Sequence, residues 1–351
     1  MKTNIWTVDN NVDKSDSYPQ LKDAAVLLQK NEVVAFPTET VYGLGANAKS
    51  DEAVKKVFLA KGRPSDNPLI VHIASKEQLG EIVASVPETA KTLMNKFWPG
   101  PLTIILEKRQ GVLSEIVTAG LDTVGVRMPD HPVALSLIAK SGLPIAAPSA
   151  NTSGKPSPTS AVHVESDLTG KIAGIVDGGP TGVGVESTVI DCTLDIPVIL
   201  RPGGITKDEI EETIGTVILD SSLKDAEAAP KAPGMKYTHY APKAPLELVK
   251  GDMEFLQNIA DRKQSEGLKV GIIAAAEHVG YYHADYILSP GKLADLRTVA
   301  QGLYDTLRKF DELDADIILS EVFPEQGIGE AVMNRLYKAA GHHVISQNDD
   351  N

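Results

Sequence analysis

Cysteine is almost absent from this sequence: Cys192 is the only one among 351 residues. A lone thiol cannot close an intrachain disulfide or supply a thiolate zinc site, so the sequence excludes both. Cys192 closely follows the apolar pair Val189 and Ile190. That setting favours a buried structural thiol over a reactive one.

Long apolar runs are absent as well. No stretch reaches the roughly 18 apolar residues that a membrane-spanning helix needs. The segment from Met1 to Asp16 is polar and lacks the apolar core of a secretion signal. The sequence therefore predicts a soluble, cytoplasmic protein that does not enter a membrane.

Positive charge is scarce relative to negative charge. The sequence has 34 Lys and Arg against 47 Asp and Glu, which gives a formal net charge of −13 at pH 7. Such a chain repels the phosphates of a long nucleic acid, so no strong direct nucleic-acid binding is expected. Local cations such as Lys61 and Arg63 are then expected to act on a small anion.

The length and composition are those of a folded protein with two domains. Hydrophobic residues make up 42% of the chain and charged residues 23%, as in globular proteins. A chain of 351 residues exceeds one ordinary domain of about 100–200 residues. We expect a first domain over 17–205, a linker over 206–243 and a second domain over 244–346.

In the first domain, short helical patterns alternate with short apolar runs, which indicates an α/β fold. Helices are expected at 21–30, 51–60, 76–84 and 88–96, and strands at 33–36, 69–73, 102–106, 124–126, 145–147, 172–176, 189–191 and 198–200. So many short strands between loops favour a mixed sheet over a regularly wound parallel one.

The remaining third of the chain differs in character. A short amphipathic helix and one strand are followed by 223-LKDAEAAPKAPGMKYTHYAPKAP-245, which has the composition of a linker. Strands are then expected at 246–249, 270–274, 286–288 and 317–319, with helices at 252–264, 293–310 and 330–340. This alternation predicts a smaller α/β domain with a parallel sheet.

Three segments concentrate the polar chemistry. In 60-AKGRPSDNPLIVH-72, Lys61 and Arg63 suit an anion, although a solvated basic turn explains this segment equally well. The hydroxyls and amides of 146-AAPSANTSGKPSPTS-160 suit phosphate, ribose or adenine, although an ordinary surface loop has the same composition. The glycines of 177-DGGPTGVGVESTVID-191 allow close approach to a ligand, but this segment is neither a P-loop nor a dinucleotide motif.

Single polar residues have simpler explanations when they are considered alone. His72, at a strand position, is more often a core histidine than a catalytic base. Arg127 and Arg201 are by default surface ion-pair partners. No set of His, Asp or Glu at metal-ligand spacing occurs, so we expect no metal site built from side chains.

Seven segments, taken in order, resemble the YrdC-like family. They are 36-FPTETVYGLG-45, 60-AKGRPSDNPLIVH-72, 98-WPGPLT-103, 124-VGVRMPDHP-132, 147-APSANTSGKPSPT-159, 184-GVESTVID-191 and 201-RPGG-204. The segments 233-PGMKYTHYAP-242 and 327-GIGEAVMNRL-336 extend the resemblance to the longer, two-domain form. The resemblance implies a twisted open mixed sheet with a basic cavity, followed by a small Rossmann-like domain.

The resemblance also implies roles for single residues. The family's KxR…SxN signature appears as Lys61, Arg63, Ser149 and Asn151, of which Lys61 and Arg63 would be catalytic. The implied threonine site consists of Thr40, His72, Arg127 and Ser187. The implied ATP site consists of Arg63, Asn67, Thr123, Ala147 through its backbone, Ser149, Asn151, Ser157 and Arg201.

The implied activity is synthesis of L-threonylcarbamoyl-AMP from threonine, bicarbonate or CO2, and ATP, with release of pyrophosphate. Mg²⁺ would accompany the ATP phosphates and need few protein ligands. The product would pass to a tRNA threonylcarbamoyl transferase, which modifies the adenosine after the anticodon. On this hypothesis Lys61 and Arg63 stabilise phosphate and carbamate charge and do not hold the fold.

Two alternatives and one further hypothesis remain at this point. The chain could be a nucleotide- or RNA-binding module without turnover, or a carbamoyl-adenylate transferase of the hydrogenase-maturation kind, for which it lacks the cysteine-rich zinc segment. In addition, 233-PGMKYTHYAP-242 is expected to act as a lid, because the aromatic rings of Tyr237 and His239 are costly to leave in water.

Overall fold

The computed structural model describes residues 2–8, 19–220 and 239–347. The chain divides into two compact units, which are described separately here. The first unit comprises Met1–Ser153, Pro158–Gly182 and Glu186–Lys236, and the second comprises Gly154–Ser157, Val183–Val185 and Tyr237–Asn351.

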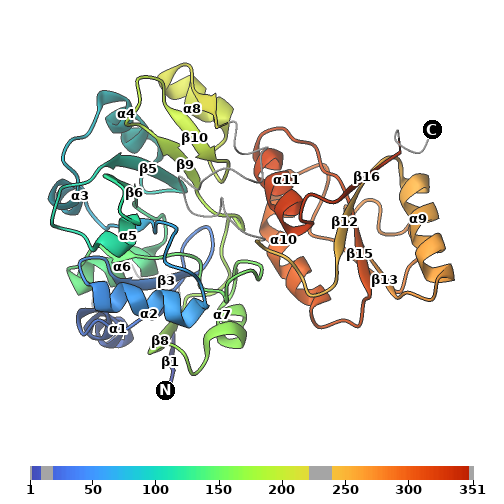
Figure 1. Ribbon diagram of the computed structural model, residues 1–351, viewed down its shortest axis with the longest axis horizontal. Coiled ribbons are helices and arrows are strands. Elements are labelled where there is room, and N and C mark those ends of the chain that lie inside the picture. Colours follow the sequence, from blue (N-terminus) through green and yellow to red (C-terminus); the bar gives the residue numbers. More distant parts are fainter. Residues whose placement is uncertain (1, 9–18, 221–238, 348–351) are drawn as a thin grey trace. The chain divides into compact units, whose positions relative to one another are not determined.

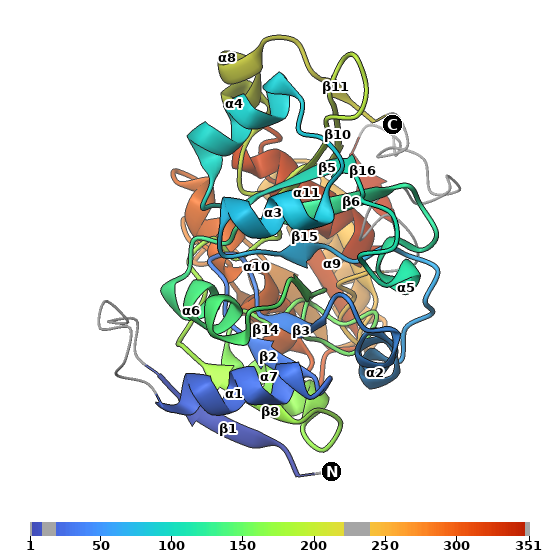
Figure 2. The same cartoon turned by 90° about the vertical axis from the view of Figure 1, so that its left-hand side faces the viewer.

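One mixed sheet organises the first unit, which confirms the predicted fold class. Its strands, in spatial order, are β1 (Asn4–Thr7), β8 (Gly174–Asp177), β2 (Val34–Phe36), β3 (Gly43–Asn47), β7 (Ile145–Ala146), β4 (Val71–His72), β6 (Thr123–Arg127), β5 (Leu102–Glu107), β9 (Thr188–Asp191), β10 (Val198–Arg201) and β11 (Ile218–Leu219). Antiparallel pairs such as β5–β6 adjoin parallel pairs such as β4–β6. Strand β1 runs beside β8 at one edge of the sheet (Figure 2).

Eight helices are described in this unit (Figure 1). They are α1 (Pro19–Gln29), α2 (Asp51–Lys61), α3 (Lys76–Ile82), α4 (Glu88–Phe97), α5 (Glu115–Thr118), α6 (Pro132–Ser141), α7 (Ala161–Leu168) and α8 (Lys207–Ile214). Helix α2 begins where the Ser50 side chain accepts a hydrogen bond from Ala53 N, and it ends at Gly62, which has φ 63°. This left-handed residue stops the helix between Lys61 and Arg63.

The two faces of the central strands have different chemistry. Because neighbouring strand residues point to opposite faces, Val124 and Val126 lie in the main apolar cluster. Thr123, Gly125 and Arg127 then share the opposite face. On that opposite face Ile70, Ile105, Val189 and Leu200 form a separate, small apolar cluster. Thr123 and Arg127, two of the substrate residues implied by the sequence, lie on this face.

Several strands differ from the sequence prediction. The run predicted at 69–73 pairs only over Val71–His72, and the motif at 36–45, for which no strand was predicted beyond Phe36, ends in β3. Strand β3 was missed because Gly43 and Gly45 have no apolar pattern; Gly45 instead allows close packing, since a Cβ there would lie 2.7 Å from the Phe36 ring. Strand β1 was missed because it pairs only with the distant β8.

The described part of the predicted linker, residues 206–220, contains α8 and β11. The Thr206 hydroxyl and the Glu209 carboxylate form a capping box at the start of α8. Strand β11 pairs in parallel with β10. These elements therefore belong to the first unit.

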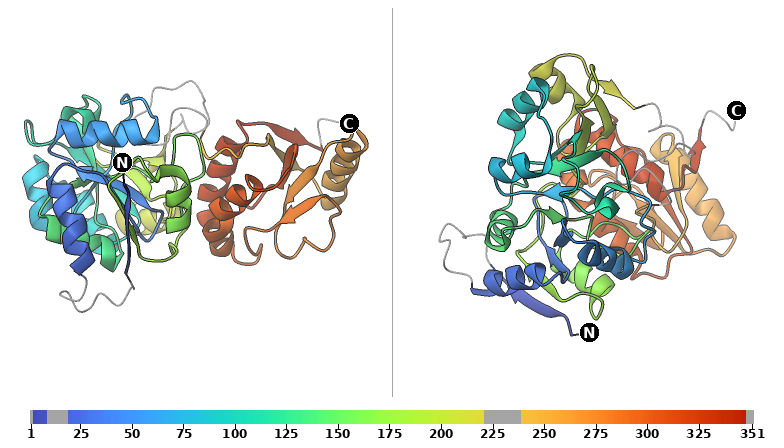
Figure 3. Two further views of the ribbon diagram at one scale, coloured as in Figure 1. Left: turned by 90° about the horizontal axis from the view of Figure 1, so that it is seen from below. Right: turned by 60° about the vertical axis from the view of Figure 1, so that its left-hand side comes forward.

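The second unit contains a five-stranded parallel sheet in the spatial order β14 (Tyr286–Leu288), β13 (Val270–Ile273), β15 (Ile317–Glu321), β12 (Leu246–Lys250) and β16 (Val344–Ser346). Helix α9 (Met253–Ser265) covers one face, and α10 (Leu296–Phe310) and α11 (Ile328–Ala339) cover the other (Figures 1 and 3). Gly271 packs against the Phe310 ring of α10. This arrangement confirms the predicted smaller parallel domain.

The aromatic end of the predicted lid is partly described. Tyr237 lies outside the described residues. The His239 ring is 5.5 Å from the Tyr240 ring, and Tyr240 lies 5.1 Å from Tyr304 of α10 and 5.9 Å from the Arg335 guanidinium of α11. Tyr240 is buried within the second unit.

Two smaller expectations concern Cys192 and membrane-spanning helices. Cys192 is buried, as predicted, and burial, followed by the nearby Asp191 charge, raises the pKa of its thiol to about 12. Within residues 2–8, 19–220 and 239–347, no helix combines the length and the apolar character needed to cross a bilayer.

Candidate active site

The predicted threonine and ATP residues are brought together first by strand β6. Thr123 begins the strand and Arg127 ends it, on the same face. At about 3.3 Å per residue, the two positions are roughly 13 Å apart. His72 of β4 is the register partner of Arg127 and lies directly beside it.

Arg127 is 4% exposed, and its guanidinium contacts three residues from two segments of the chain. Nη1 donates to Thr40 Oγ1 at 2.9 Å, and Nε donates to the Gly100 carbonyl at 3.3 Å. Nη2 lies 2.6 Å from Glu39 Oε2. The structure thus joins the predicted residues Thr40 and Arg127, and it adds Glu39, which sequence reasoning missed although it lies inside the motif 36-FPTETVYGLG-45.

His72 is buried edge-on against the Phe36 ring, with ring centroids 6.2 Å apart. Burial, followed by the Arg127 charge, lowers the pKa of His72 to about 3, so the imidazole is neutral at physiological pH. Its Nδ1 is buried and has no hydrogen-bond partner among the described residues. A neutral ring whose Nδ1 has no hydrogen-bond partner among the described residues can bind a polar ligand group.

Ser187 lies just before β9 and is fixed from two sides. Its hydroxyl is 2.8 Å from the Thr103 hydroxyl on β5. Arg201 donates to the Ser187 carbonyl from Nε at 3.1 Å and from Nη2 at 2.9 Å, and Nη2 also donates to the Ser187 hydroxyl at 3.2 Å. Thr103 was missed by sequence reasoning; a buried threonine in the apolar run 102-LTIIL-106 was the available signal.

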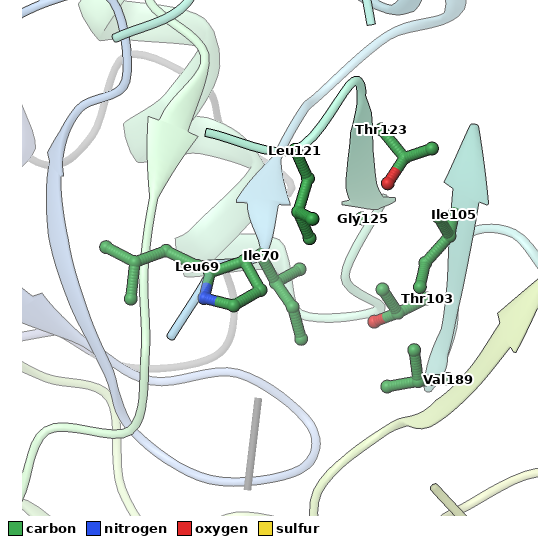
Figure 4. Close-up of a pocket in the computed structure, with 9 residues that line it drawn as sticks. Leu69, Ile70, Thr103, Ile105, Leu121, Thr123, Gly125 and Val189 are labelled. Carbon is green, nitrogen blue, oxygen red and sulfur yellow. The ribbon is translucent and has the colours of Figure 1, made fainter. Parts of the chain in front are cut away.

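A small pocket that is partly open to solvent lies over the same sheet face. It is lined by Pro68, Leu69, Ile70, Thr103, Ile105, Leu121, Thr123, Gly125 and Val189. Figure 4 shows the hydroxyl-bearing side chains of Thr103 and Thr123 among apolar ones. A Cβ added at Gly125 would lie 3.2 Å from Thr103 Cγ2, so the missing side chain of Gly125 helps to keep the pocket open.

The KxR…SxN residues meet through Lys61. Its side chain is buried, and Nζ donates to the carbonyls of Ser149 at 2.5 Å and Asn151 at 2.7 Å, and to Asn151 Oδ1 at 3.3 Å. Ala150 N in turn donates to the Tyr42 carbonyl at 2.8 Å. Lys61 therefore holds the 149–151 loop in place through these hydrogen bonds. This contradicts the expectation that Lys61 does not contribute to the folded structure.

The other predicted ATP residues have different positions. Arg63 is half-buried beside the Phe58 ring, and its Nη2 is 3.5 Å from the carbonyl of the buried Asn67. Ala147 N donates to the carbonyl of the pocket residue Ile70 at 2.9 Å. Ser157 is buried within the segment Gly154–Ser157, which belongs to the second unit.

Two family models match the chain. The model of the Sua5, YciO and YrdC family, described as Telomere recombination, matches residues 26–203. A model described as Threonylcarbamoyl-AMP synthase, C-terminal domain, matches residues 205–341. Together the two models cover nearly all of the described chain.

Curated relatives match over almost the full length. The threonylcarbamoyl-AMP synthase of Bacillus subtilis is 61% identical over 345 residues, which is 98% of this chain and 100% of the relative. The threonylcarbamoyl-AMP synthase of Pyrococcus abyssi is 50% identical, with 93% of this chain and 95% of the relative covered.

A solved structure is similar to the whole chain as well. The crystal structure of Pyrococcus abyssi Sua5 complexed with L-threonine has a TM-score of 0.91 and 47% sequence identity. The match covers 98% of this chain and 99% of that chain.

Proposed function

The chain belongs to the Sua5/YrdC family of two-domain threonylcarbamoyl-AMP synthases, and from this premise we propose that it makes L-threonylcarbamoyl-AMP. The reaction uses L-threonine, bicarbonate or CO2, and ATP, and releases pyrophosphate, so the enzyme is a nucleotidyltransferase. The observation that carries the proposal is that one sheet face bears a buried cation at Arg127 and a largely apolar pocket at Thr123, about 13 Å along the same strand.

The Arg127 end suits threonine. The guanidinium would bind the α-carboxylate, and Thr40 keeps it in place through the hydrogen bond from Nη1. The neutral His72 ring has an unused Nδ1 that would bind the threonine hydroxyl. Ser187, fixed by Thr103 and Arg201, would complete this end.

The Thr123 end suits the nucleoside of ATP. Ile70, Ile105 and Val189 offer apolar surface to a flat base, and the Thr123 hydroxyl offers a hydrogen bond to its polar edge or to the ribose. The phosphates would then lie near the proposed cations Arg63 and Arg201 and the proposed ligands Asn67, Ser149, Asn151 and Ser157, with Ala147 contributing backbone atoms.

The reaction then requires that the protein position the two reactants and place positive charge beside them, and it does not require a nucleophilic side chain. The threonine ammonium first loses a proton. The free amine nitrogen then forms a bond to the carbon of CO2 as one C–O π bond opens, and a further proton leaves the nitrogen, which gives a carbamate. If bicarbonate is the source, one of its C–O bonds breaks as well and water leaves. A carbamate oxygen attacks the α-phosphorus of ATP, the bond between α-phosphorus and bridging oxygen breaks, and pyrophosphate leaves. Because both reactants are anions, Lys61, Arg63 and Arg201 would lower their repulsion, with Lys61 acting partly through the 149–151 loop it holds.

Mg²⁺ would reach the site on the ATP phosphates, as part of the substrate, and its charge would add to that of the arginines. We also propose that the product passes to a tRNA threonylcarbamoyl transferase in the cytoplasm, where it supplies the modification of the adenosine after the anticodon. The lid role of Tyr237 and His239 stays a prediction for the full chain.

A pyrophosphate-release assay with ATP, bicarbonate and each amino acid in turn tests the reaction and the substrate together. We expect release that depends on threonine, with serine a poor substrate, because one missing methyl contact is worth about 1–3 kcal/mol. Binding of ATP without release would support the binding module. Turnover of carbamoyl phosphate in place of threonine would support the hydrogenase-maturation alternative.

A further inference from the structure

Glu39 is a buried carboxylate whose hydrogen-bonding capacity is unused. Its side chain is 12% exposed, and Oε2 lies 2.6 Å from Arg127 Nη2. Neither Oε1 nor Oε2 has a hydrogen-bond partner of good geometry among the described residues, and Arg127 Nη2 has none either. The pair is thus close in distance but not aligned, and a buried carboxylate without donors is costly.

The protein holds this carboxylate in place. Thr38 Oγ1 accepts hydrogen bonds from Thr40 N at 3.2 Å and Val41 N at 3.3 Å, which fixes the turn around Glu39. Gly182 N donates to the Glu39 carbonyl at 3.1 Å. The backbone that carries Glu39 is therefore held on both sides.

Few charged groups surround Glu39. Arg127 is the cation, and its Nε and Nη1 are already engaged by Gly100 and Thr40. Asp130 is exposed, and burial, followed by the Glu39 charge, raises the pKa of its carboxyl. His131 is buried, and burial lowers its pKa, so the ring is neutral near pH 7. Of these groups, Arg127 is the cation that forms an ion pair with Glu39.

An adjacent guanidinium and carboxylate, both with buried polar atoms, complement the two opposite charges that every α-amino acid has on groups attached to the same carbon. We propose that Glu39 binds the α-amino group of threonine while Arg127 binds its α-carboxylate. This inference rests on the proposed function, and it adds a specificity: the site selects an amino acid over the matching hydroxy acid. The ammonium supplies the donors that both Glu39 oxygens lack, and its entry aligns the pair that the free protein leaves misaligned.

Two ligands and three proteins test the assignment. Calorimetry compares L-threonine with 2,3-dihydroxybutanoate of the same configuration, which keeps the carboxylate, the side-chain hydroxyl and the methyl but replaces the amine by a hydroxyl. The proteins are the wild type, Glu39→Gln and Asp130→Asn. The last removes an exposed negative charge near Glu39 and is the matched control.

The wild type is expected to prefer threonine by about 10–100-fold, the range of a hydrogen bond between charged groups. In Glu39→Gln that preference should fall below about threefold, because threonine alone loses affinity. Asp130→Asn should keep the wild-type preference. Glu39→Asp retains the charge one methylene farther from the ligand, and it should show an intermediate preference.

Other outcomes have distinct meanings. If Glu39→Gln binds both ligands more tightly, Glu39 merely competes with the substrate for Arg127, and the inference is overturned. If both ligands bind more weakly by the same factor and the melting temperature drops, Glu39 only supports the structure, which also overturns it. Failure of the wild type to bind threonine would overturn the proposed function itself.

Discussion

At the scale of single residues, the charged and polar groups of the site fall into two kinds. The Lys61 ammonium donates hydrogen bonds to three oxygens of the protein, which are the carbonyls of Ser149 and Asn151 and the side-chain oxygen of Asn151. His72 and Glu39 instead have buried polar atoms without hydrogen-bond partners among the described residues, although Glu39 forms an ion pair with Arg127. The first kind shapes the site and the second is available to a ligand, so their variants should behave differently.

Lys61→Met should lower both stability and rate. The variant leaves two carbonyl oxygens and the Asn151 amide oxygen without their donor, and an unsatisfied buried acceptor costs about 1–3 kcal/mol. Urea unfolding followed by tryptophan fluorescence measures this in the first unit, because Trp6 and Trp98 both lie there.

The matched control is Lys55→Met, on the exposed side of the same helix α2, which should change stability by less than about 0.5 kcal/mol. A Lys61→Met protein with wild-type stability and greatly reduced turnover would show that Lys61 acts on the substrate alone.

The lowered pKa of His72 predicts that the free energy of unfolding depends on pH. Its pKa is about 3 in the folded protein and near 6.5 in the unfolded chain. Between these values only the unfolded chain takes up the proton, so stability is fully present above pH 6.5 and is lost as the pH falls toward 3. From pH 7 to pH 5 this group should account for about 2 kcal/mol of lost stability.

His72→Gln removes that group. Its free energy of unfolding should therefore fall by about 2 kcal/mol less than that of the wild type between pH 7 and pH 5, measured by urea titration at each pH. Parallel pH curves for the two proteins would mean that His72 has the same pKa in the folded and the unfolded states.

At the scale of elements, β6 combines a site residue at each end with a glycine in the middle. Gly125→Ala should raise the KM for ATP about tenfold, because the new Cβ enters the pocket 3.2 Å from Thr103 Cγ2 and overpacking costs about 1–3 kcal/mol. The KM for threonine should change much less.

Gly80→Ala in α3 is the control for this substitution, because no atom lies within 4 Å of the added Cβ. It should leave both KM values unchanged and should stabilise the helix by about 0.5–1 kcal/mol. Equal KM values for ATP in the two variants would place the nucleoside outside this pocket.

At the scale of the whole molecule, the net charge of −13 argues against a direct tRNA complex. Fluorescence anisotropy with labelled unmodified tRNA at physiological salt should give a Kd weaker than about 10⁻⁵ M, within the range of non-specific binding. A submicromolar Kd that weakens steeply with salt would instead reveal a basic surface that the net charge conceals.

The sequence by itself determined the elements whose signals are local. Helix α2 is defined by its cap residue Ser50, its apolar spacing and the terminal Gly62, all within a few turns. Most elements of the second unit were predicted for the same reason, because they have a clear apolar period. The edge strand β16 was missed, because its three residues are exposed or only partly buried and it is recognisable only by its pairing with β12. The motifs also identified Thr40, Arg127 and the KxR…SxN residues, but only through the resemblance to a family.

The tertiary structure alone decided which of these residues meet and what each one contacts. Lys61 reaches a carbonyl 88 positions away, and Arg127 reaches a hydroxyl 87 positions away. Such contacts depend on the order of strands in the mixed sheet, where β4 lies beside β6 and β6 beside β5. Strand order is set by the packing of the whole core, so no local pattern could show that Lys61 holds a loop, that Thr103 fixes Ser187 or that Glu39 lies unaligned beside Arg127.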